Sequence, residues 1–276
     1  MSSLGRLLLV LQIASIAALG APKSHLGGGP LGAIPHDGKA LAYSFGVLGG
    51  FDKVVQYLAA QRVLSRPAAR KVMHCGAGPL FLCCWPWFSA APSARYWASV
   101  GPMALTLKAF LAGAGIVDDP KTVASMSRSG DRRELLRGPT LYGTVFVAAT
   151  VSCWRSLAGI IALVALCAGD GFAEIVGRSP LGRRGPRLPW CPRKSLAGSL
   201  AFFGATLCSA TAFALKFAHL GWWAPLPTRA LVAGVAKVAA AAALAESLET
   251  GPWDNPIIFA VAAAAARVAL PPGHSL

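Results

Sequence analysis

Two acidic residues, Asp170 and Glu174, lie near the end of the apolar stretch SLAGIIALVALCAGDGFAEIVGR (residues 156–178). Carboxylates are costly at the edge of such a segment and need a compensating partner. A spacing of four residues places both side chains on one face of a helix, where like charges repel unless a cation lies between them. Mg²⁺ suits such a pair because it binds one or two carboxylates together with phosphate oxygens. The alternative interpretation is that each acid pairs with a nearby arginine.

A candidate phosphate site follows in the sequence PRKSLAGS. It places Lys194, Ser195, Gly198 and Ser199 at the expected start of a helix. The free N–H groups of a helix N-terminus and a neighbouring ammonium group bind phosphate readily. Serine is also a common helix cap and lysine a common flank of an apolar segment, so the motif alone has low specificity. It differs from the P-loop, which requires the pattern G-x-x-x-x-G-K-[ST].

Further polar residues recur beside the other apolar segments. The stretch ESLETGPWDN supplies Glu246, Asp254 and Asn255, and these additional acids favour the metal interpretation of Asp170. The rest of the candidate nucleotide- and phosphate-binding set is Arg70, Lys71, His74, Arg128, Arg137 and Gly171. Gly171 beside Asp170 would let a ligand approach the backbone. A lone histidine on a helix, such as His74, is more often a packing or hydrogen-bonded residue than a functional one.

The composition indicates that these groups belong to a membrane protein. Of the 276 residues, 55% are hydrophobic and only 13% are charged, and the mean hydropathy is +0.55. Soluble domains rarely reach such values, so we expect an all-α, polytopic helical membrane protein. The net charge of +15 comes from basic residues between apolar segments, which favours membrane orientation and phosphate contacts over a nucleic-acid partner. The seven cysteines form no CxxC pair, which argues against a zinc site.

About eight transmembrane helices are expected. The apolar segments cover residues 38–60, 72–91, 96–117, 139–154, 156–176, 195–215, 229–248 and 256–270. Several are shorter than the ~20 residues that a perpendicular span requires. The loop 118–138 is polar and predicted to be partly helical, whereas the loop 177–194 is rich in Pro and Arg and cannot continue a helix. We therefore expect one membrane-embedded domain over residues 38–276.

Residues 1–37 are expected to form a targeting leader and a linker. One arginine precedes a short apolar run that ends in small residues near Gly20, as in a secretory signal peptide. The following stretch, APKSHLGGGPLGAIPHDG, is rich in Gly and Pro, as a linker would be. The alternative is a short first membrane helix that stays attached.

The basic residues predict which ends of the segments share one side of the membrane. Most of the Lys and Arg residues lie in the loops 61–71, 118–138 and 177–194. The opposite loops hold only Arg95, Arg155 and Lys216. The positive-inside rule places the first set on the cytosolic or stromal side. The opposite ends carry Trp85, Trp87, Trp97, Trp154, Trp222 and Trp223, as an aromatic belt would.

One interpretation accounts for these features together. Basic groups and Mg²⁺ would hold a polyphosphate at the inner interface, and the bilayer would deliver a lipid substrate. This chemistry is phosphoryl or nucleotidyl transfer to a membrane lipid. A transporter is the alternative of a different class, and it would carry charged residues along a path through the membrane midplane. Here the charged residues gather on one face instead.

In order and spacing, several motifs resemble those of the polyprenol kinases, most closely plant-type phytol and farnesol kinases. The motifs are ARKVMHCGAGPLFLCCWPWFS, SRSGDRRELLRGP, GDGFAEIVGR, PRKSLAGS and the ESL and DN of ESLETGPWDN. The resemblance runs from about residue 68 to the end of the chain. It implies a multi-spanning kinase that transfers the γ-phosphoryl group of a nucleotide, typically CTP, to an isoprenoid alcohol. Phytol is the first candidate, in phytol salvage for tocopherol synthesis, and the plastid membrane is the implied location, although the leader also fits the ER.

The resemblance also implies roles for individual residues. Asp170 and Glu174 would hold Mg²⁺, whereas Glu246 or Asp254 would hold a second metal or accept the proton of the alcohol. Lys194, Arg128 and Arg137 would neutralise phosphate charge.

Two positions depart from the family pattern. Glu174 replaces the second aspartate of G-D-G-x-A-D. Trp253 replaces the first aspartate of Asp-Asp-Asn, so metal ligation at that position is in question. The other two residues of the pattern, Asp254 and Asn255, are present.

Two questions stay open at the level of the sequence. A lipid cytidylyltransferase, which would form a CDP-lipid and release pyrophosphate, could use the same residues. The identity of the alcohol (phytol, geranylgeraniol, farnesol or dolichol) is also open, because apolar pockets discriminate by only ~1–3 kcal/mol per methylene. The oligomeric state leaves no signal in the sequence.

Overall fold

The computed structural model describes residues 35–248 and 250–271. Contacts divide the chain between Trp154 and Arg155 into two compact units. We call them the N-terminal unit (described residues 35–154) and the C-terminal unit (described residues 155–248 and 250–271). The hydropathy pattern does not mark this division. The expected leader lies outside the described residues, and the first described helix already includes the last two residues of the expected linker.

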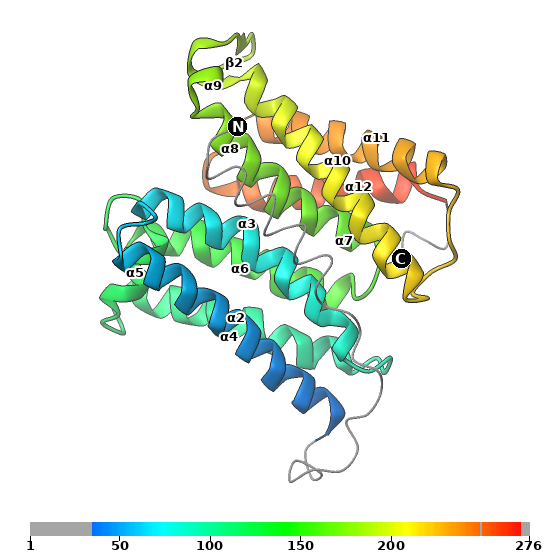
Figure 1. Ribbon diagram of the computed structural model, residues 1–276, viewed down its shortest axis with the longest axis horizontal. Helices are drawn as coiled ribbons and strands as arrows, with labels where there is room; N and C mark the ends of the chain where they lie inside the picture. Colours follow the sequence, from blue (N-terminus) through cyan, green and yellow to red (C-terminus); the bar gives the residue numbers. More distant parts are fainter. Residues whose placement is uncertain (1–34, 249, 272–276) are drawn as a thin grey trace. The chain divides into compact units, whose positions relative to one another are not determined.

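The N-terminal unit is a group of helices (Figure 1). They are α2 (His36–Ala60), α3 (Arg66–Cys84), α4 (Ala94–Ala114), α5 (Pro120–Met126) and α6 (Glu134–Ser152), with a 3₁₀ turn, η1, at Trp85–Trp87. Helix α4 packs against both α2 and α6. The boundaries follow local signals: the hydroxyl of Ser65 caps α3 by accepting the N–H of Ala68, and α4 ends at Gly115, whose φ of 75° suits glycine.

Side chains of the N-terminal unit enclose part of the expected aromatic belt. Trp85 is fully buried. Its ring centroid lies 4.7 Å from that of Trp154 and 6.1 Å from that of Phe81. The belt interpretation is therefore wrong for Trp85, because its indole is covered by other aromatic rings of the same unit and cannot meet lipid.

The C-terminal unit is built around one long helical segment (Figure 1). The elements in chain order are α7 (Leu157–Val164), the π-helical turn η2 (Ala165–Gly169), α8 (Asp170–Gly177), α9 (Pro180–Arg184), β1 (Arg187–Leu188), β2 (Cys191–Ser195), α10 (Leu196–His219), α11 (Thr228–Ser247), η3 (Gly251–Trp253) and α12 (Asp254–Ala269). Every residue of α7 and η2 is buried. A helix that is apolar on all sides is expected at such a central position, and α10 and α12 both pack against α7.

The predicted all-α class is confirmed. Each of the eight predicted apolar segments overlaps a helix, and the loop 118–138 contains the short helix α5, as expected. Within the loop 177–194, β1 and β2 form a small antiparallel hairpin. Three helical segments of the described chain are long and apolar enough to cross a membrane: Leu157–Gly177, Leu196–His219 and Thr228–Ser247. All three belong to the C-terminal unit.

Candidate active site

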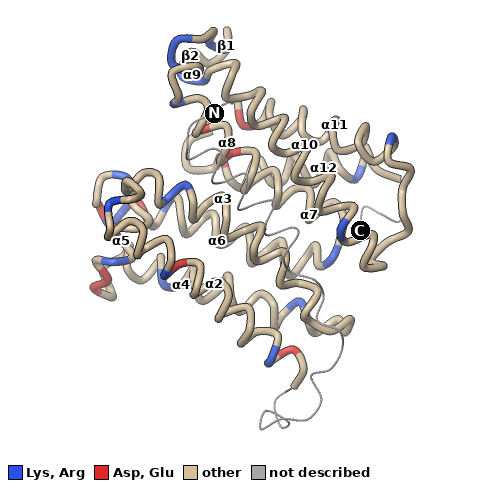
Figure 2. The backbone as a smooth tube through the Cα atoms, in the orientation of Figure 1, with Lys and Arg blue, Asp and Glu red and all other residues tan. Residues whose placement is uncertain are grey.

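The described acidic residues of the C-terminal unit gather at one end of it. This is the end that carries the β1–β2 hairpin (Figure 2). The acids are Asp170, Glu174, Glu246 and Asp254. The order of the helices explains this arrangement, because successive long helices run in opposite directions. Helices α8 and α11 end here, whereas α10 and α12 begin here. Residues far apart in the sequence thereby come together.

Lys194 and Glu246 form the central ion pair of this end. The Lys194 ammonium donates a hydrogen bond to Oε1 of Glu246. The Glu246 side chain is only 6% exposed and that of Lys194 is 24% exposed. Strand β2 carries Lys194, and its pairing with β1 holds Ser195 opposite Arg187. The sequence predicts both charged residues as site members but does not pair them, since 52 positions separate them.

The charges around Lys194 keep it protonated. Burial alone would lower the pKa of the Lys194 ammonium, but the Glu246 carboxylate together with nearby acids outweighs this effect, and the pKa lies above its ordinary value. The charges of Asp170 and Asp254 act in the same direction as that of Glu246. The four groups therefore form one electrostatic cluster, to which α8, β2, α11 and α12 each contribute a residue. Lys194 serves in it as a fixed cation and not as a base.

Two of the acids in this region also have local structural partners. Asp254 Oδ1 accepts hydrogen bonds from the backbone N–H and the hydroxyl of Thr250, both at 2.7 Å, and so fixes the turn before α12. Glu174 lies 3.0 Å from the Arg178 guanidinium, one helical turn further along. For Glu174, the structure thus contains the arginine pairing that the sequence offers as the alternative to a metal. Asn255 follows Asp254 in the first turn of α12 and is half-buried.

The start of α10 is a capped helix N-terminus, as predicted. Ser195 Oγ accepts the N–H of Gly198 at 3.1 Å, and the N–H of Leu196 donates to the Pro186 carbonyl at 3.0 Å. A Cβ on Gly198 would lie 3.1 Å from the Ala173 carbonyl oxygen, so this glycine allows α10 to approach α8. The hydroxyl of Ser199 is buried and has no hydrogen-bond partner among the described residues. Phosphate binding by Lys194, Ser195, Gly198 and Ser199 stays a prediction.

A π-helical turn immediately precedes Asp170, and the sequence analysis does not predict it. The Asp170 N–H donates to the Ala165 carbonyl, five residues back. One inserted residue rotates the following helix by about 100° relative to a continuous α-helix, so η2 decides the direction of the Asp170 side chain. Such bulges are often found at functional sites. The only sequence signal is the glycine that ends the turn, Gly169.

Gly169 lets η2 lie close to α10. A Cβ built on it would lie 2.5 Å from Thr206 Oγ1 and 2.8 Å from the Phe202 ring. Thr206 is fully buried, and its hydroxyl has no hydrogen-bond partner among the described residues. Buried polar groups without partners are rare in native proteins. A buried Thr206 hydroxyl without a hydrogen bond, beside η2, is therefore an unusual feature.

The Gly169→Ala variant is expected to lose activity because the added methyl group displaces η2 and reorients Asp170. Overpacking of this kind costs about 1–3 kcal/mol of stability. Gly204→Ala is the matched control, since a Cβ at that position of α10 meets nothing within 4 Å. Thermal unfolding in detergent and initial rates of product formation provide the measurement. Equal activity of the two variants would show that the close approach at Gly169 does not determine the position of Asp170.

Of the remaining candidates, Gly171 is buried in α8, and the other five belong to the N-terminal unit. Arg70, Lys71 and His74 lie on α3, Arg128 lies between α5 and α6, and Arg137 lies on α6. The Tyr142 hydroxyl of α6 donates to the His74 backbone carbonyl at 3.1 Å, and the two rings lie 4.5 Å apart. The packing interpretation of His74 therefore has a structural basis. Nucleotide binding by these five residues stays a prediction.

The loop that holds Arg128 is ordered by one carboxylate. Glu134 accepts the Arg128 N–H at 2.5 Å and the Ser129 hydroxyl at 2.6 Å. The motif SRSGDRRE thus closes on itself in a turn before α6. The Glu134 carboxylate therefore serves to hold this turn through these hydrogen bonds.

Comparison with known proteins decides the family. The chain is 38% identical over 219 residues to "Probable phytol kinase 2, chloroplastic" of Oryza sativa subsp. japonica, an alignment that covers 78% of this chain and 69% of the relative. This chain belongs to the plant-type phytol and farnesol kinase family. No protein-family model matches it, and neither does any solved structure.

Other members of the phytol and farnesol kinase family show similar identity. "Phytol kinase 1, chloroplastic" of Arabidopsis thaliana is 34% identical over 212 residues, with 74% of this chain and 69% of the relative covered. "Farnesol kinase, chloroplastic" of the same organism is 38% identical over 162 residues, with 58% and 52% covered. The chain thus spans from about half to about seven tenths of the length of these relatives. Three of the motifs that carry the family resemblance, GDGFAEIVGR, PRKSLAGS and the ESL and DN of ESLETGPWDN, meet at the hairpin end of the C-terminal unit.

Proposed function

We propose that this chain is a membrane-embedded kinase that transfers the γ-phosphoryl group of CTP to the hydroxyl of an isoprenoid alcohol, with phytol as the first candidate. The names of its relatives, phytol kinase and farnesol kinase, support the reaction class and the substrate class. The observation that carries the proposal is the charge cluster of Lys194, Glu246, Asp170 and Asp254. It lies at one end of helices long enough to cross a bilayer.

The reaction forms one bond and breaks one. The alcohol oxygen bonds to the γ-phosphorus while the bond from the γ-phosphorus to the bridging oxygen breaks, which yields an alcohol monophosphate and CDP. The proton of the hydroxyl passes to a carboxylate, for which we propose Glu246 or Asp254. Lys194 balances negative charge on the phosphates. Because the transition state of phosphoryl transfer is loose, positioning and charge neutralisation supply most of the catalysis.

Mg²⁺ is the proposed cofactor, with Asp170 as its main protein ligand and Glu174 as the second. In the described part of the chain, no three His, Cys, Asp or Glu residues come together as a metal cage. Two carboxylates would be enough for the proposed ion, because Mg²⁺ takes one or two carboxylates and completes its shell with phosphate oxygens and water. When bound, the ion neutralises charge that develops on the phosphate oxygens.

The role of Glu174 can be separated from its pairing with Arg178. If Glu174 binds the metal, Glu174→Asp should keep substantial activity, whereas Glu174→Gln should lose much more, because a neutral amide cannot balance the ion. The control is Arg178→Ala, which removes the pairing but keeps the carboxylate. An ion pair one helical turn apart on a helix typically contributes only ~0.3–0.5 kcal/mol, so the control should stay active. Rates across a Mg²⁺ titration measure this, and a Gln variant equal to wild type at low Mg²⁺ would remove Glu174 from the site.

The proposed arrangement in the membrane has eight spans, with the basic loops on the stromal or cytosolic side of a plastid membrane. The ER is the alternative location. The chloroplastic names of the relatives and the three long apolar helices support the plastid membrane.

Cysteine labelling should reveal the sidedness of the C-terminal unit. Reporters at Leu181 and Pro252 are expected to react from the same side of the membrane and one at Thr228 from the opposite side. All three positions are exposed. The background variant should lack Cys208, which is exposed, and Cys153, which is partly exposed. Labelling of all three reporters from one side would refute the arrangement.

One assay tests the proposed function directly. Purified protein receives CTP labelled on the γ-phosphate and a panel of phytol, geranylgeraniol, farnesol and dolichol. A kinase transfers the label to the alcohol and releases CDP, whereas a lipid cytidylyltransferase releases labelled pyrophosphate. Transfer to none of the alcohols, with Mg²⁺ present, would overturn the proposal.

A further inference from the structure

Lys237 lies at the midpoint of α11, a helix long and apolar enough to cross a membrane. Its side chain is exposed. Nine residues separate it from the start of the helix and ten from the end, or about 13–15 Å in either direction at 1.5 Å per residue. The other Lys and Arg residues of the three membrane-length segments, Lys216 and Arg229, lie within one turn of a helix end and can reach the membrane surface. Lys237 is too deep to do so.

The Lys237 ammonium also meets no acid of its own chain. It makes no hydrogen bond or ion pair with any residue of 35–248 or 250–271. The one acid of α11, Glu246, lies about two and a half turns away and so on the opposite face. Of the two long helices that pack against α11, α10 has no acid, and α12 has only Asp254 at its first position. A charge at such a depth in a membrane is costly, and it is almost always paired.

The side of α11 that carries Lys237 is otherwise apolar, and we call it the outer stripe. Its other members are Ala233, Ala240, Ala241, Leu244 and Leu248. One turn before Lys237 and one turn after it, the stripe has only alanine side chains. In a membrane, small residues at such positions let a second helix approach closely, and polar side chains then bond across the two helices.

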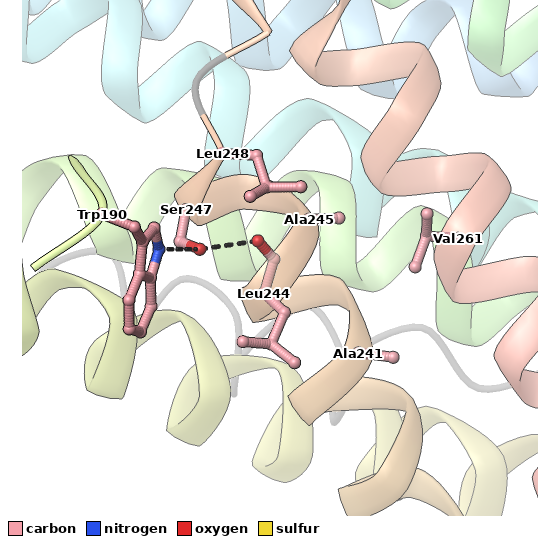
Figure 3. Close-up of a pocket in the computed structure, with 7 residues that line it drawn as sticks. All are labelled: Trp190, Ala241, Leu244, Ala245, Ser247, Leu248 and Val261. Atoms are coloured by element: carbon pink, nitrogen blue, oxygen red, sulfur yellow. Dashed lines mark hydrogen bonds between the residues drawn. The ribbon is translucent and has the colours of Figure 1, made fainter. Parts of the chain in front are cut away.

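The part of the outer stripe next to the hairpin is hollowed (Figure 3). A groove of about 380 Å³ opens there, and its lining includes Ala241, Leu244, Leu248 and Trp190. The polar atoms at its edge bond one another: the Trp190 indole N–H donates to the Ser247 hydroxyl at 3.0 Å, and that hydroxyl donates to the Leu244 carbonyl at 2.6 Å. The groove therefore suits apolar side chains of a neighbour.

We infer that the outer stripe binds a transmembrane helix of another protein, one that carries a single acidic residue at its midpoint and places the carboxylate against Lys237. A membrane helix brings a carboxylate to this depth while its own backbone groups stay hydrogen-bonded. The phosphate of a lipid lies at the bilayer surface and cannot meet Lys237. Two copies of this chain joined through the outer stripe by a two-fold axis would bring like charges together, so the partner is a different protein.

A synthetic partner tests the inference. The full-length protein with Ala240→Cys is reconstituted in phosphatidylcholine vesicles with a leucine-rich peptide of about 21 residues, long enough to span the bilayer. The peptide has Glu at its centre and a cysteine one turn away, and mass spectrometry identifies the disulfides formed. We expect a disulfide at position 240, and at least about fivefold less of it when Gln replaces the central Glu. Cys208, which is exposed near the midpoint of α10, is the internal control for random encounter.

Two substitutions of Lys237 separate its charge from the shape of the stripe. Lys237→Arg keeps the charge and should keep the preference for the Glu peptide. Lys237→Leu removes the charge and should react equally with both peptides. The inference is overturned by equal reaction of the two peptides with the Lys237 chain, by a preference that survives Lys237→Leu, or by disulfides mainly at Cys208. Disulfides between two copies through position 240, formed in the absence of peptide, would make the stripe a contact between copies and also overturn it.

The inference stands apart from the proposed reaction. Lys237 lies far from the charge cluster, so Lys237→Leu should transfer phosphoryl groups at the wild-type rate in detergent. A loss of transfer in this variant would place Lys237 in the reaction and contradict a docking role. If the wild-type chain transfers no phosphoryl group but prefers the Glu peptide, the proposed function fails and the docking surface stands. Should Lys237→Leu not fold, as judged by size-exclusion chromatography, the comparison of the two peptides on the Lys237 chain decides.

Discussion

Asp170→Asn is expected to abolish phosphoryl transfer while the protein stays folded. The substitution keeps the size of the side chain and removes its charge. Asp170 is the first residue of α8 after the π-helical turn, and its charge acts on both Lys194 and Glu246. Loss of a group that stabilises charge in the transition state typically costs 10²–10³ in kcat, and we expect at least that much here.

The matched control for this variant is Asp118→Asn, which makes the same change at an exposed position in the N-terminal unit. Initial rates at saturating CTP and phytol, together with thermal unfolding in detergent, provide the measurement. An unfolding temperature close to wild type, with activity lost, would identify a functional carboxylate. Near-normal turnover of Asp170→Asn would end the metal assignment.

Lys194→Met should affect both stability and activity. It removes the ammonium and keeps the apolar stem, so Glu246, whose side chain is 6% exposed, loses its ion partner. Removing one member of a buried ion pair commonly destabilises a protein by about 3–5 kcal/mol. Because Lys194 is also proposed to contact the phosphates, the KM for CTP should rise and kcat should fall.

A double variant separates these two effects. Lys194→Met with Glu246→Gln leaves no unpaired charge, so the unfolding temperature should return toward the wild-type value. Activity should not return with it, because the phosphate contact is still missing and Glu246 is a proposed proton acceptor. Recovery of activity along with stability would show that the pair is purely structural. A Lys194→Met variant with wild-type stability and rates would make Lys194 a simple flank of the apolar segment.

Hydropathy and motif order were enough to predict a large part of this protein. The apolar segments coincide with helices, and the family resemblance carried by GDGFAEIVGR and PRKSLAGS is confirmed by the comparisons. These features depend on residues close together in the chain: a helix face repeats every three or four residues, and the Ser195 cap reaches only to Gly198. Local patterns of this kind survive in the sequence without knowledge of the fold.

Only the tertiary structure decided which of the candidate groups meet. The ion pair of Lys194 with Glu246 and the bond of Trp190 to Ser247 join positions more than fifty residues apart. The sequence offers Glu174 as either a metal ligand or a partner of arginine, and it places Trp85 in a belt that the fold instead buries. The π-helical turn before Asp170 leaves no periodic signal, and the close neighbours of its Gly169, Phe202 and Thr206, come from α10, more than thirty residues further along the chain. Such contacts depend on how helices pack, and packing is a property of the folded chain as a whole.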